Sequence, residues 1–427
     1  MNRRMRAVPI YFAFMAADGF FFKIVSVIFS VFLILRLGLG PFELVLMGTI
    51  LEGSFLLFET TSGVVADTIG RRNSIVIGMT GCGLATLLLG VSHTFWMAAA
   101  AQVGGGVFAT FVSGADIAWL TDEVGEEAAR SLYLRGDQIA HAAAFVGIVA
   151  GVALATVDLA LPILVAGFGY LFIAFALWAV MPEEHFEPRA RGAGERLHHS
   201  LIATFKDGLR DARAHPVLLL ILGTTALHGA STEGFDRLAD FHILRDIGLP
   251  VIGHLSRLWW FAILDGVSML IGIGALAIVR RRANLQGHVA VARLLAAIDV
   301  ALVASVVVFA LAGQFWPAIV AAWVVGALRS VRDPIGVAWI NQGLDAKTRA
   351  TINSMGSQSD AIGQAAGGPA LGAIAGGFGA PFAIVVSGLL RFPSLLLYRR
   401  AIKKGTVGTL APDEIEPALH LEDETAG

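Results

Sequence analysis

Apolar residues occur along this chain in long runs, which short polar or Gly/Pro segments separate. A membrane span needs about 20 mostly apolar residues to cross a hydrocarbon core of ~30 Å. We expect the runs to be helices, because a backbone that faces lipid must satisfy its own hydrogen bonds and because the runs lack the alternation of barrel strands. Twelve runs qualify, at residues 9–34, 42–66, 73–91, 95–120, 136–156, 161–181, 216–242, 253–279, 289–313, 315–340, 353–375 and 381–398.

The composition agrees with a membrane protein. Of the 427 residues, 56% are hydrophobic and only 15% are charged, whereas a soluble domain has about 25% charged residues. The first run is too long for a signal-peptide core, so we expect it to be retained. Cys82 is the one cysteine, which excludes an internal disulfide.

Lysine and arginine are distributed unevenly between the two sides of the predicted membrane. With the N-terminus inside, the cytoplasmic segments hold 22 of the 31 basic residues, and the outer loops hold two, Arg36 and Arg245. The positive-inside rule therefore predicts a multi-pass protein of the cell (inner or plasma) membrane with both termini in the cytoplasm.

The chain repeats itself once. Arg71 and Arg72 recur as Arg280 and Arg281 at an offset of 209, and Trp119 recurs as Trp339 at an offset of 220. Six spans per half give both halves the same orientation, which is typical of one large class of transporters. We therefore expect an all-α membrane protein of two pseudo-symmetric six-helix bundles, at residues 1–181 and 216–398, with a cytoplasmic linker at 182–215 and a cytoplasmic tail at 399–427.

The linker has an apolar residue at every fourth position, at Leu197, Leu201, Phe205 and Leu209, among charged residues. This pattern predicts an amphipathic helix at the inner membrane interface. A solvated helix that contacts only protein is the alternative.

Three ionisable residues interrupt the apolar pattern between the second and third runs, in GVVADTIGRR at residues 63–72. Gly63, Asp67, Gly70, Arg71 and Arg72 resemble the loop signature of the major facilitator superfamily, and only Thr68 departs from it, where the family usually has Arg or Lys. The resemblance implies a latch in which Asp67 meets the N-terminal end of the eleventh span near Asn353. It also implies that Arg71 pairs with Asp122. Anchoring of both arginines at anionic headgroups is the alternative.

Several charged residues lie inside predicted spans, where each costs about 2.5–3.5 kcal/mol on insertion scales. Glu52 and Glu59 share one face of the second span, which therefore cannot face lipid. They are candidate proton carriers, or else hydrogen-bonded structural groups. The seventh span carries a stripe of charged residues. The stripe either lines a wet cavity or forms a self-neutralising charge ladder along the helix. That stripe consists of Glu233, Asp236, Arg237 and Asp240.

In the family that the chain resembles, spans 1, 4, 7 and 10 line the central cavity. The resemblance therefore assigns ten residues to the cavity wall or its gates, namely Asp18, Lys23, Asp116, Glu233, Asp236, Arg237, Asp240, Arg329, Arg332 and Asp333. Asp299 and Arg391 lie on peripheral spans, where we expect a structural pair, and Asp265 is ambiguous. His141 is either a proton relay or, preferably, a satisfied core histidine.

These features predict a secondary transporter that works by alternating access and is coupled to protons. Export of small amphipathic or drug-like molecules is the preferred function, and proton-coupled import of a small metabolite is the alternative. We expect a monomer whose partners are a small-molecule substrate, protons and the lipid bilayer, with no nucleic acid, cofactor or metal. No catalytic motif is present, so we do not expect an enzyme.

Overall fold

A computed structural model describes residues 4–183, 186, 216–282, 288–340 and 346–404, and all its named elements are helical. The predicted linker helix lies outside these residues. The first part of the chain contains α1 (Arg4–Leu35), α2 (Pro41–Ile69), α3 (Arg71–Gly90), α4 (Phe95–Val112), α5 (Ala115–Val124), α6 (Glu126–Ala155) and α7 (Leu161–Val180). The second part contains α9 (Pro216–Phe241), the π-helix η1 (His242–Ile247), α10 (Trp259–Arg282), α11 (His288–Leu311), α12 (Phe315–Ile340), α13 (Ala346–Phe378), α14 (Ala380–Leu389) and α15 (Phe392–Lys404).

Nine helical segments of the described residues are long and apolar enough to cross a membrane. They coincide with nine of the twelve predicted spans. The other three predicted spans are α9, α12 and α13, which have 26, 26 and 33 residues. At 1.5 Å per residue these helices are also long enough to cross a membrane. The prediction of an all-helical protein with many spans is confirmed.

Two of the predicted spans are interrupted in the structure. The fourth is broken between α4 and α5 at Gly114, whose φ of +76° favours glycine. The twelfth is broken between α14 and α15 at Leu390 and Arg391. A break frees backbone groups from the helical ladder and lets a polar side chain turn inward. Asp116 lies directly after the first break, and Arg391 lies within the second.

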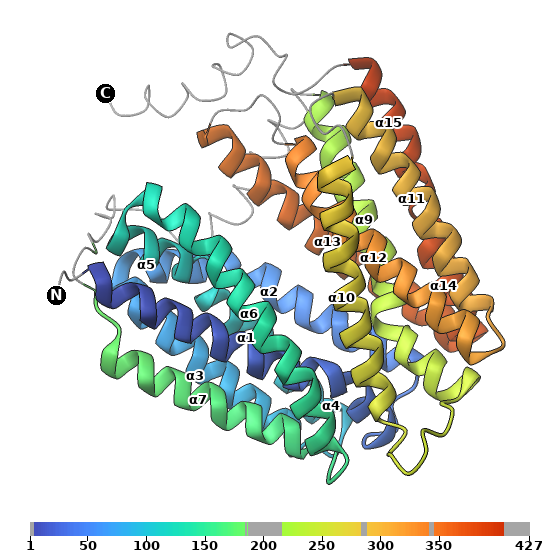
Figure 1. Ribbon diagram of the computed structural model, residues 1–427, viewed down its shortest axis with the longest axis horizontal. Coiled ribbons are helices and arrows are strands. Elements are labelled where there is room, and N and C mark those ends of the chain that lie inside the picture. The colour runs from blue at the N-terminus through green and yellow to red at the C-terminus, as the bar shows by residue number, and fades with distance from the viewer. Residues whose placement is uncertain (1–3, 184–185, 187–215, 283–287, 341–345, 405–427) are drawn as a thin grey trace. The chain divides into compact units, whose positions relative to one another are not determined.

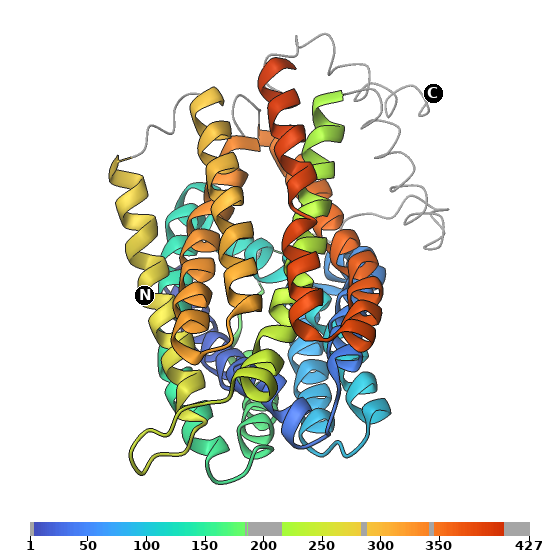
Figure 2. The same cartoon turned by 90° about the vertical axis from the view of Figure 1, so that its right-hand side faces the viewer.

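The contacts divide the chain into two compact units. Unit 1 comprises residues 1–197, 237–266 and 375–377, and unit 2 comprises residues 198–236, 267–374 and 378–427. In unit 1, α1 packs against α6, and α3 packs against α4 and α7 (Figure 1). In unit 2, α11 packs against α12, α14 and α15. Figure 2 shows α9 (light green) beside α15 (red), where Gly223 faces Leu397.

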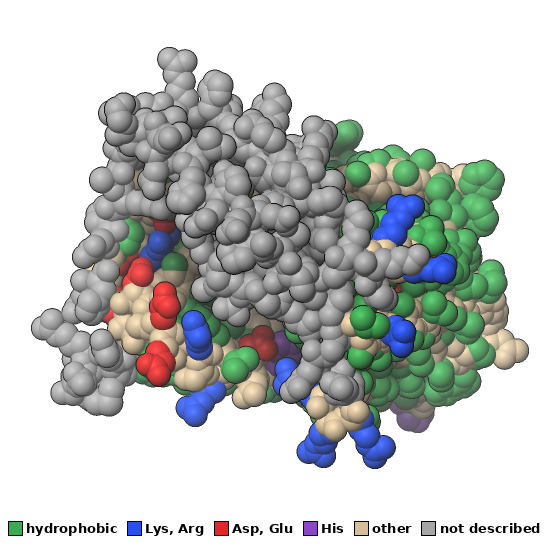
Figure 3. Space-filling view, turned by 90° about the horizontal axis from the view of Figure 1, so that it is seen from above, with side chains coloured by type: hydrophobic (Ala, Val, Ile, Leu, Met, Phe, Trp, Pro, Cys, Tyr) green, Lys and Arg blue, Asp and Glu red, His purple; other side chains and the backbone are tan. Residues whose placement is uncertain are grey.

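Large apolar side chains are exposed on the outer faces of the helices. Phe168, Phe172 and Phe175 of α7 are 64%, 69% and 63% exposed and lie on one helical face. Figure 3 shows a broad hydrophobic flank, in green, next to a face on which Lys and Arg side chains are visible. An apolar surface of this extent is what a bilayer covers.

Candidate functional site

The connection between α2 and α3 is a single glycine, Gly70. Its φ of +107° suits glycine, and a Cβ there would lie 2.6 Å from a carboxylate oxygen of Glu183. That carboxylate accepts a hydrogen bond from the backbone N–H of Arg72, with 2.8 Å between N and Oε1. The loop signature therefore ends α2 sharply and attaches the start of α3 to the segment that follows α7.

The charged residues of the signature meet inside unit 1. Arg71 pairs with Asp67 one helical turn earlier, and its Nε lies 3.8 Å from Asp122 Oδ2. The Arg72 side chain donates a hydrogen bond to the carbonyl of Trp178. Asp67, Arg71 and Asp122 are thus brought together, while Gly63 lies in the body of α2 with open space beside it.

Asp18 and Asp116 are acidic residues on two contacting helices of unit 1. Asp18 lies on α1 and Asp116 in the first turn of α5, where backbone N–H groups stabilise a carboxylate. The two helices pack together, and Asp116 is close enough for its charge to act on Asp18. Within the described residues neither acid has an ion pair with lysine or arginine. Buried Tyr11, Phe14 and Trp119 line the same helices.

Other ionisable groups of unit 1 are paired with opposite charges. Lys23 Nζ lies 2.8 Å from Asp265 Oδ2. The nearby Asp240 is hydrogen-bonded to a serine of α1, Ser30, and interacts with the charges of Lys23 and Asp265. A second pair joins Arg237 to Glu52 at 3.7 Å.

The pair of Arg237 and Glu52 depends on the glycine one turn before Glu52. A Cβ at Gly48 would collide with the guanidinium of Arg237. The absence of a side chain at Gly48 thus leaves room for the guanidinium of Arg237 beside Glu52. Glu59 lies further along α2 and is partly buried.

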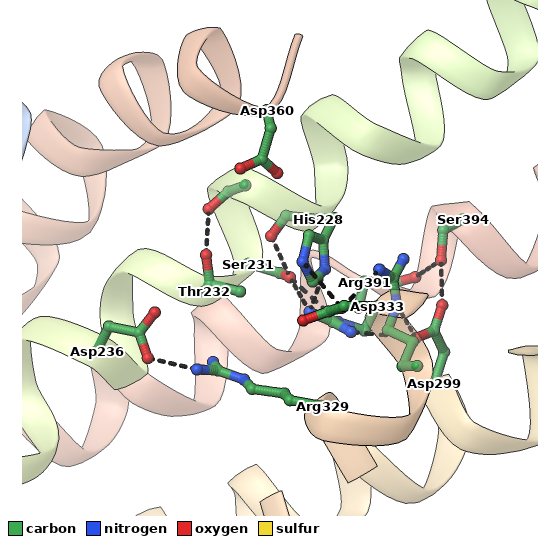
Figure 4. A network of polar contacts seen from close by, with 12 residues as sticks. His228, Ser231, Thr232, Asp236, Asp299, Arg329, Asp333, Asp360, Arg391 and Ser394 are labelled. Atoms are coloured by element: carbon green, nitrogen blue, oxygen red, sulfur yellow. Dashed lines mark hydrogen bonds and ion pairs between the residues drawn. The ribbon is translucent and has the colours of Figure 1, made fainter. Parts of the chain in front are cut away.

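Unit 2 contains a network of charged side chains around one fully buried carboxylate (Figure 4). Asp299 of α11 has no solvent exposure, and its Oδ1 accepts hydrogen bonds from Arg332 Nε and Arg391 NH1, both at 3.0 Å. Arg332 also donates to Asp333 Oδ1 at 3.3 Å and to Tyr398 Oη at 3.2 Å. Two buried arginines therefore share one buried aspartate.

The same network reaches the seventh span. Arg391 donates to Ser231 Oγ from Nε and NH2, at 3.1 and 2.9 Å, and to His228 Nδ1 from NH2 at 2.8 Å. His228 Nε2 lies 3.7 Å from Asp333 Oδ1. A separate pair joins Asp236 to Arg329, whose guanidinium lies 5.1 Å from the ring centre of Phe235. The side chains of α9 are thus tied to α12 and to the break between α14 and α15.

The sequence matches the family described as the Major Facilitator Superfamily over residues 11–298, which is more than half of the chain. The chain belongs to the major facilitator superfamily. It is a secondary transporter of this family, whose members carry small molecules across membranes and are not enzymes. No curated protein matches the chain in sequence.

Solved structures of major facilitator transporters resemble the chain over nearly its full length. A crystal structure of a mutant of the nucleoside transporter NupG has a TM-score of 0.73 at 10% identity and covers 93% of this chain and 99% of its own. An auto-inhibited peptide transporter of the POT family has a TM-score of 0.72 at 14% identity, covering 94% and 97%. A bacterial homologue of the human lysosomal transporter Spinster, inward-facing and occupied, has a TM-score of 0.70 at 12% identity, covering 95% and 98%.

Some expectations for individual residues of this major facilitator transporter need correction. Asp299 and Arg391 do form the expected pair, and Arg391 also contacts α9. Asp236 pairs with Arg329 on another helix, so the stripe on α9 is not a self-contained ladder. His141 pairs with Asp137 at 3.4 Å and its side chain is 59% exposed, so it is not a core histidine.

Sequence reasoning missed His228, Ser231, Tyr398 and Ser394 as partners of the charged network. His228 and Ser231 are three residues apart, on one face of a helix. That spacing could have drawn attention to both residues. It could not identify Arg391 as their partner, since Arg391 follows them by 163 and 160 residues.

Glu233 is the first residue of the predicted stripe on α9. It is buried in unit 2, with 1% exposure. Its burial agrees with a stripe that faces away from lipid.

Proposed function

We propose that this transporter exports small amphipathic cations in exchange for protons, and that Asp18 and Asp116 form the exchange site. The observation that supports this proposal is the presence of two acids on contacting helices, the charge of one acting on the other, without a lysine or arginine partner in the described residues. A charge at membrane depth is costly unless it is neutralised. Either a proton or a cationic substrate can neutralise this site.

Competition for one site determines the direction of coupled transport. If a proton displaces the cation and the cation displaces the proton, the two cross the membrane in opposite directions. The buried aromatic side chains on the same helices suit an amphipathic cation, which an aromatic face attracts. In this account the latch around Asp67, Arg71 and Asp122 holds the cytoplasmic ends of the helices during the cycle.

The test uses purified protein in liposomes with an imposed pH gradient, ethidium as the probe, and the membrane potential clamped with potassium and valinomycin. An antiporter accumulates ethidium when the interior is acidic, whichever way the protein is inserted. A symporter accumulates its substrate when the exterior is acidic. Accumulation of ethidium against an acidic interior supports exchange, whereas accumulation of a nucleoside or a dipeptide from an acidic exterior supports the import alternative.

Two variants and a control locate the site. Asp18→Asn and Asp116→Asn should each reduce gradient-driven ethidium accumulation at least tenfold, because each removes one of the two negative charges that bind the cation or the proton in turn. The control is Asp158→Asn, which removes an acid paired with Arg36 in a loop between predicted spans. Equal accumulation by all three variants would exclude Asp18 and Asp116 as the exchange site.

A further inference from the structure

His228 lies between two groups that impose opposite demands on its ring. Its Nδ1 accepts a hydrogen bond from Arg391 NH2 at 2.8 Å. An arginine can only donate, so Nδ1 must carry a lone pair and the ring proton must be on Nε2. Nε2 points to Asp333, with 3.7 Å to Oδ1, a separation that a proton-bearing ring or an intervening water can span. The contacts therefore fix His228 as a neutral ring with one tautomer.

Asp333 is the more exposed partner in its contact with this histidine. Its side chain is 53% exposed, whereas that of His228 is 16% exposed and that of Asp299 is fully buried. Figure 4 shows Asp333 and Arg391 close to the His228 ring. A proton from solvent can thus reach Asp333 first and His228 next.

We propose that His228 is a second proton-binding residue of this transporter, and that its protonation breaks one of the hydrogen bonds by which Arg391 holds α9. This inference rests on the proposed proton coupling but concerns a different unit from Asp18 and Asp116. A second proton on the ring would occupy Nδ1 and face an N–H of Arg391. Two donors and two positive charges cannot keep a 2.8 Å contact, so the imidazolium turns towards Asp333.

Of the charged groups around His228, Asp333 favours a positively charged ring, whereas Arg329, Arg332 and Arg391 oppose it. Arg391 lies at the break between α14 and α15, Arg329, Arg332 and Asp333 lie on α12, and Asp299 on α11 binds Arg391 from behind. Asp360 of α13 lies across Gly229, the neighbour of His228. After the change Arg391 keeps Asp299 and Ser231, while Asp333 gains the cation. Protonation of His228 therefore creates a new ion pair, between His228 and Asp333, within the same network.

The packing of α9 against α13 explains why the hydrogen bond between His228 and Arg391 matters for the position of α9. Cβ atoms at Gly229 and Gly363 would collide with backbone oxygens of Asp360 and Ala226, so α9 and α13 approach each other closely. Small residues at a helix interface allow such close approach, but they contribute no hydrogen-bonding side chains. The directional contacts of His228 and Ser231 with Arg391 then fix the register of α9.

The first test needs no substrate. Purified protein labelled with ¹⁵N-histidine is studied by NMR between pH 5 and 9, and His228→Asn identifies the signal of this residue among the 11 histidines. We expect an unprotonated Nδ1 and a protonated Nε2 at high pH, and a fully protonated ring at low pH. A ring protonated at Nδ1 at high pH, or a signal that does not change over this range, would overturn the proposal.

The second test separates a proton-binding role from a structural one. His228→Asn keeps an acceptor for Arg391 but cannot titrate, whereas Ser231→Ala removes the other α9 contact of Arg391 and leaves the histidine intact. We expect His228→Asn to lose the pH dependence of transport while substrate counterflow persists, since counterflow needs no net proton movement. Ser231→Ala should keep the pH dependence at a changed rate. A His228→Asn profile that matches the parent protein would refute the inference, even if gradient-driven transport itself is confirmed.

Discussion

Asp299 allows the cost of an unbalanced buried charge to be measured. The variant Asp299→Asn keeps the shape of the side chain but removes the negative charge that Arg332 and Arg391 share at 3.0 Å. The exposed fractions of these arginine side chains are 11% and 6%, so water compensates little. Removal of one partner from a buried ion pair costs about 3–5 kcal/mol, and we expect a loss of unfolding free energy in that range.

Asp333→Asn is the matched control. It makes the same chemical change beside the same Arg332, but the Asp333 side chain is 53% exposed. Exposed pairs contribute about 0–1 kcal/mol, so the control should lose at most that amount. The assay is reversible unfolding in mixed micelles, followed by tryptophan fluorescence. Equal losses in the two variants would refute the argument that burial decides the cost.

The remaining predictions concern glycines and the latch. Gly70→Ala should destabilise the protein by about 1–3 kcal/mol, because φ is positive at this position. Gly63→Ala lies inside a helix with open space beside it and should stabilise the protein slightly. Similar unfolding curves for the two variants would contradict this expectation. Gly363→Ala should slow transport because its Cβ collides with backbone, and Gly356→Ala, which meets nothing, should not; equal transport rates would count against tight packing there. Asp67→Asn should lower the transport rate with expression intact, and an unchanged rate would remove the latch argument.

The helices of this protein could be predicted from the sequence because the requirement for a lipid-facing backbone is local. A run of about 20 apolar residues has few alternatives in a bilayer. The breaks could not be predicted in the same way. The chain has 49 glycines, and only some of them, such as Gly114, adopt a conformation that ends a helix. Which glycine does so depends on packing with other helices.

The candidate sites were predictable as residues but not as contacts. The cost of a charge in a span identifies Asp18, Asp299 and Arg391 from the sequence alone. The partner of each charge depends on which helix faces come together, and helical periodicity gives only the face of each helix. Ser231 could therefore not be assigned to Arg391 in advance.

The charge balance of the unit 2 network limits what it can do. Arg332 and Arg391 carry two positive charges, and Asp299 and Asp333 carry two negative ones, so the group is neutral while His228 is neutral. One added proton leaves a net charge of +1 in a setting where charge is expensive. The network must then rearrange towards water, and Asp333 is its most exposed member. Motion in the proposed mechanism should therefore begin on the α9 and α12 side of the network, while the buried pair of Asp299 and Arg391 stays together.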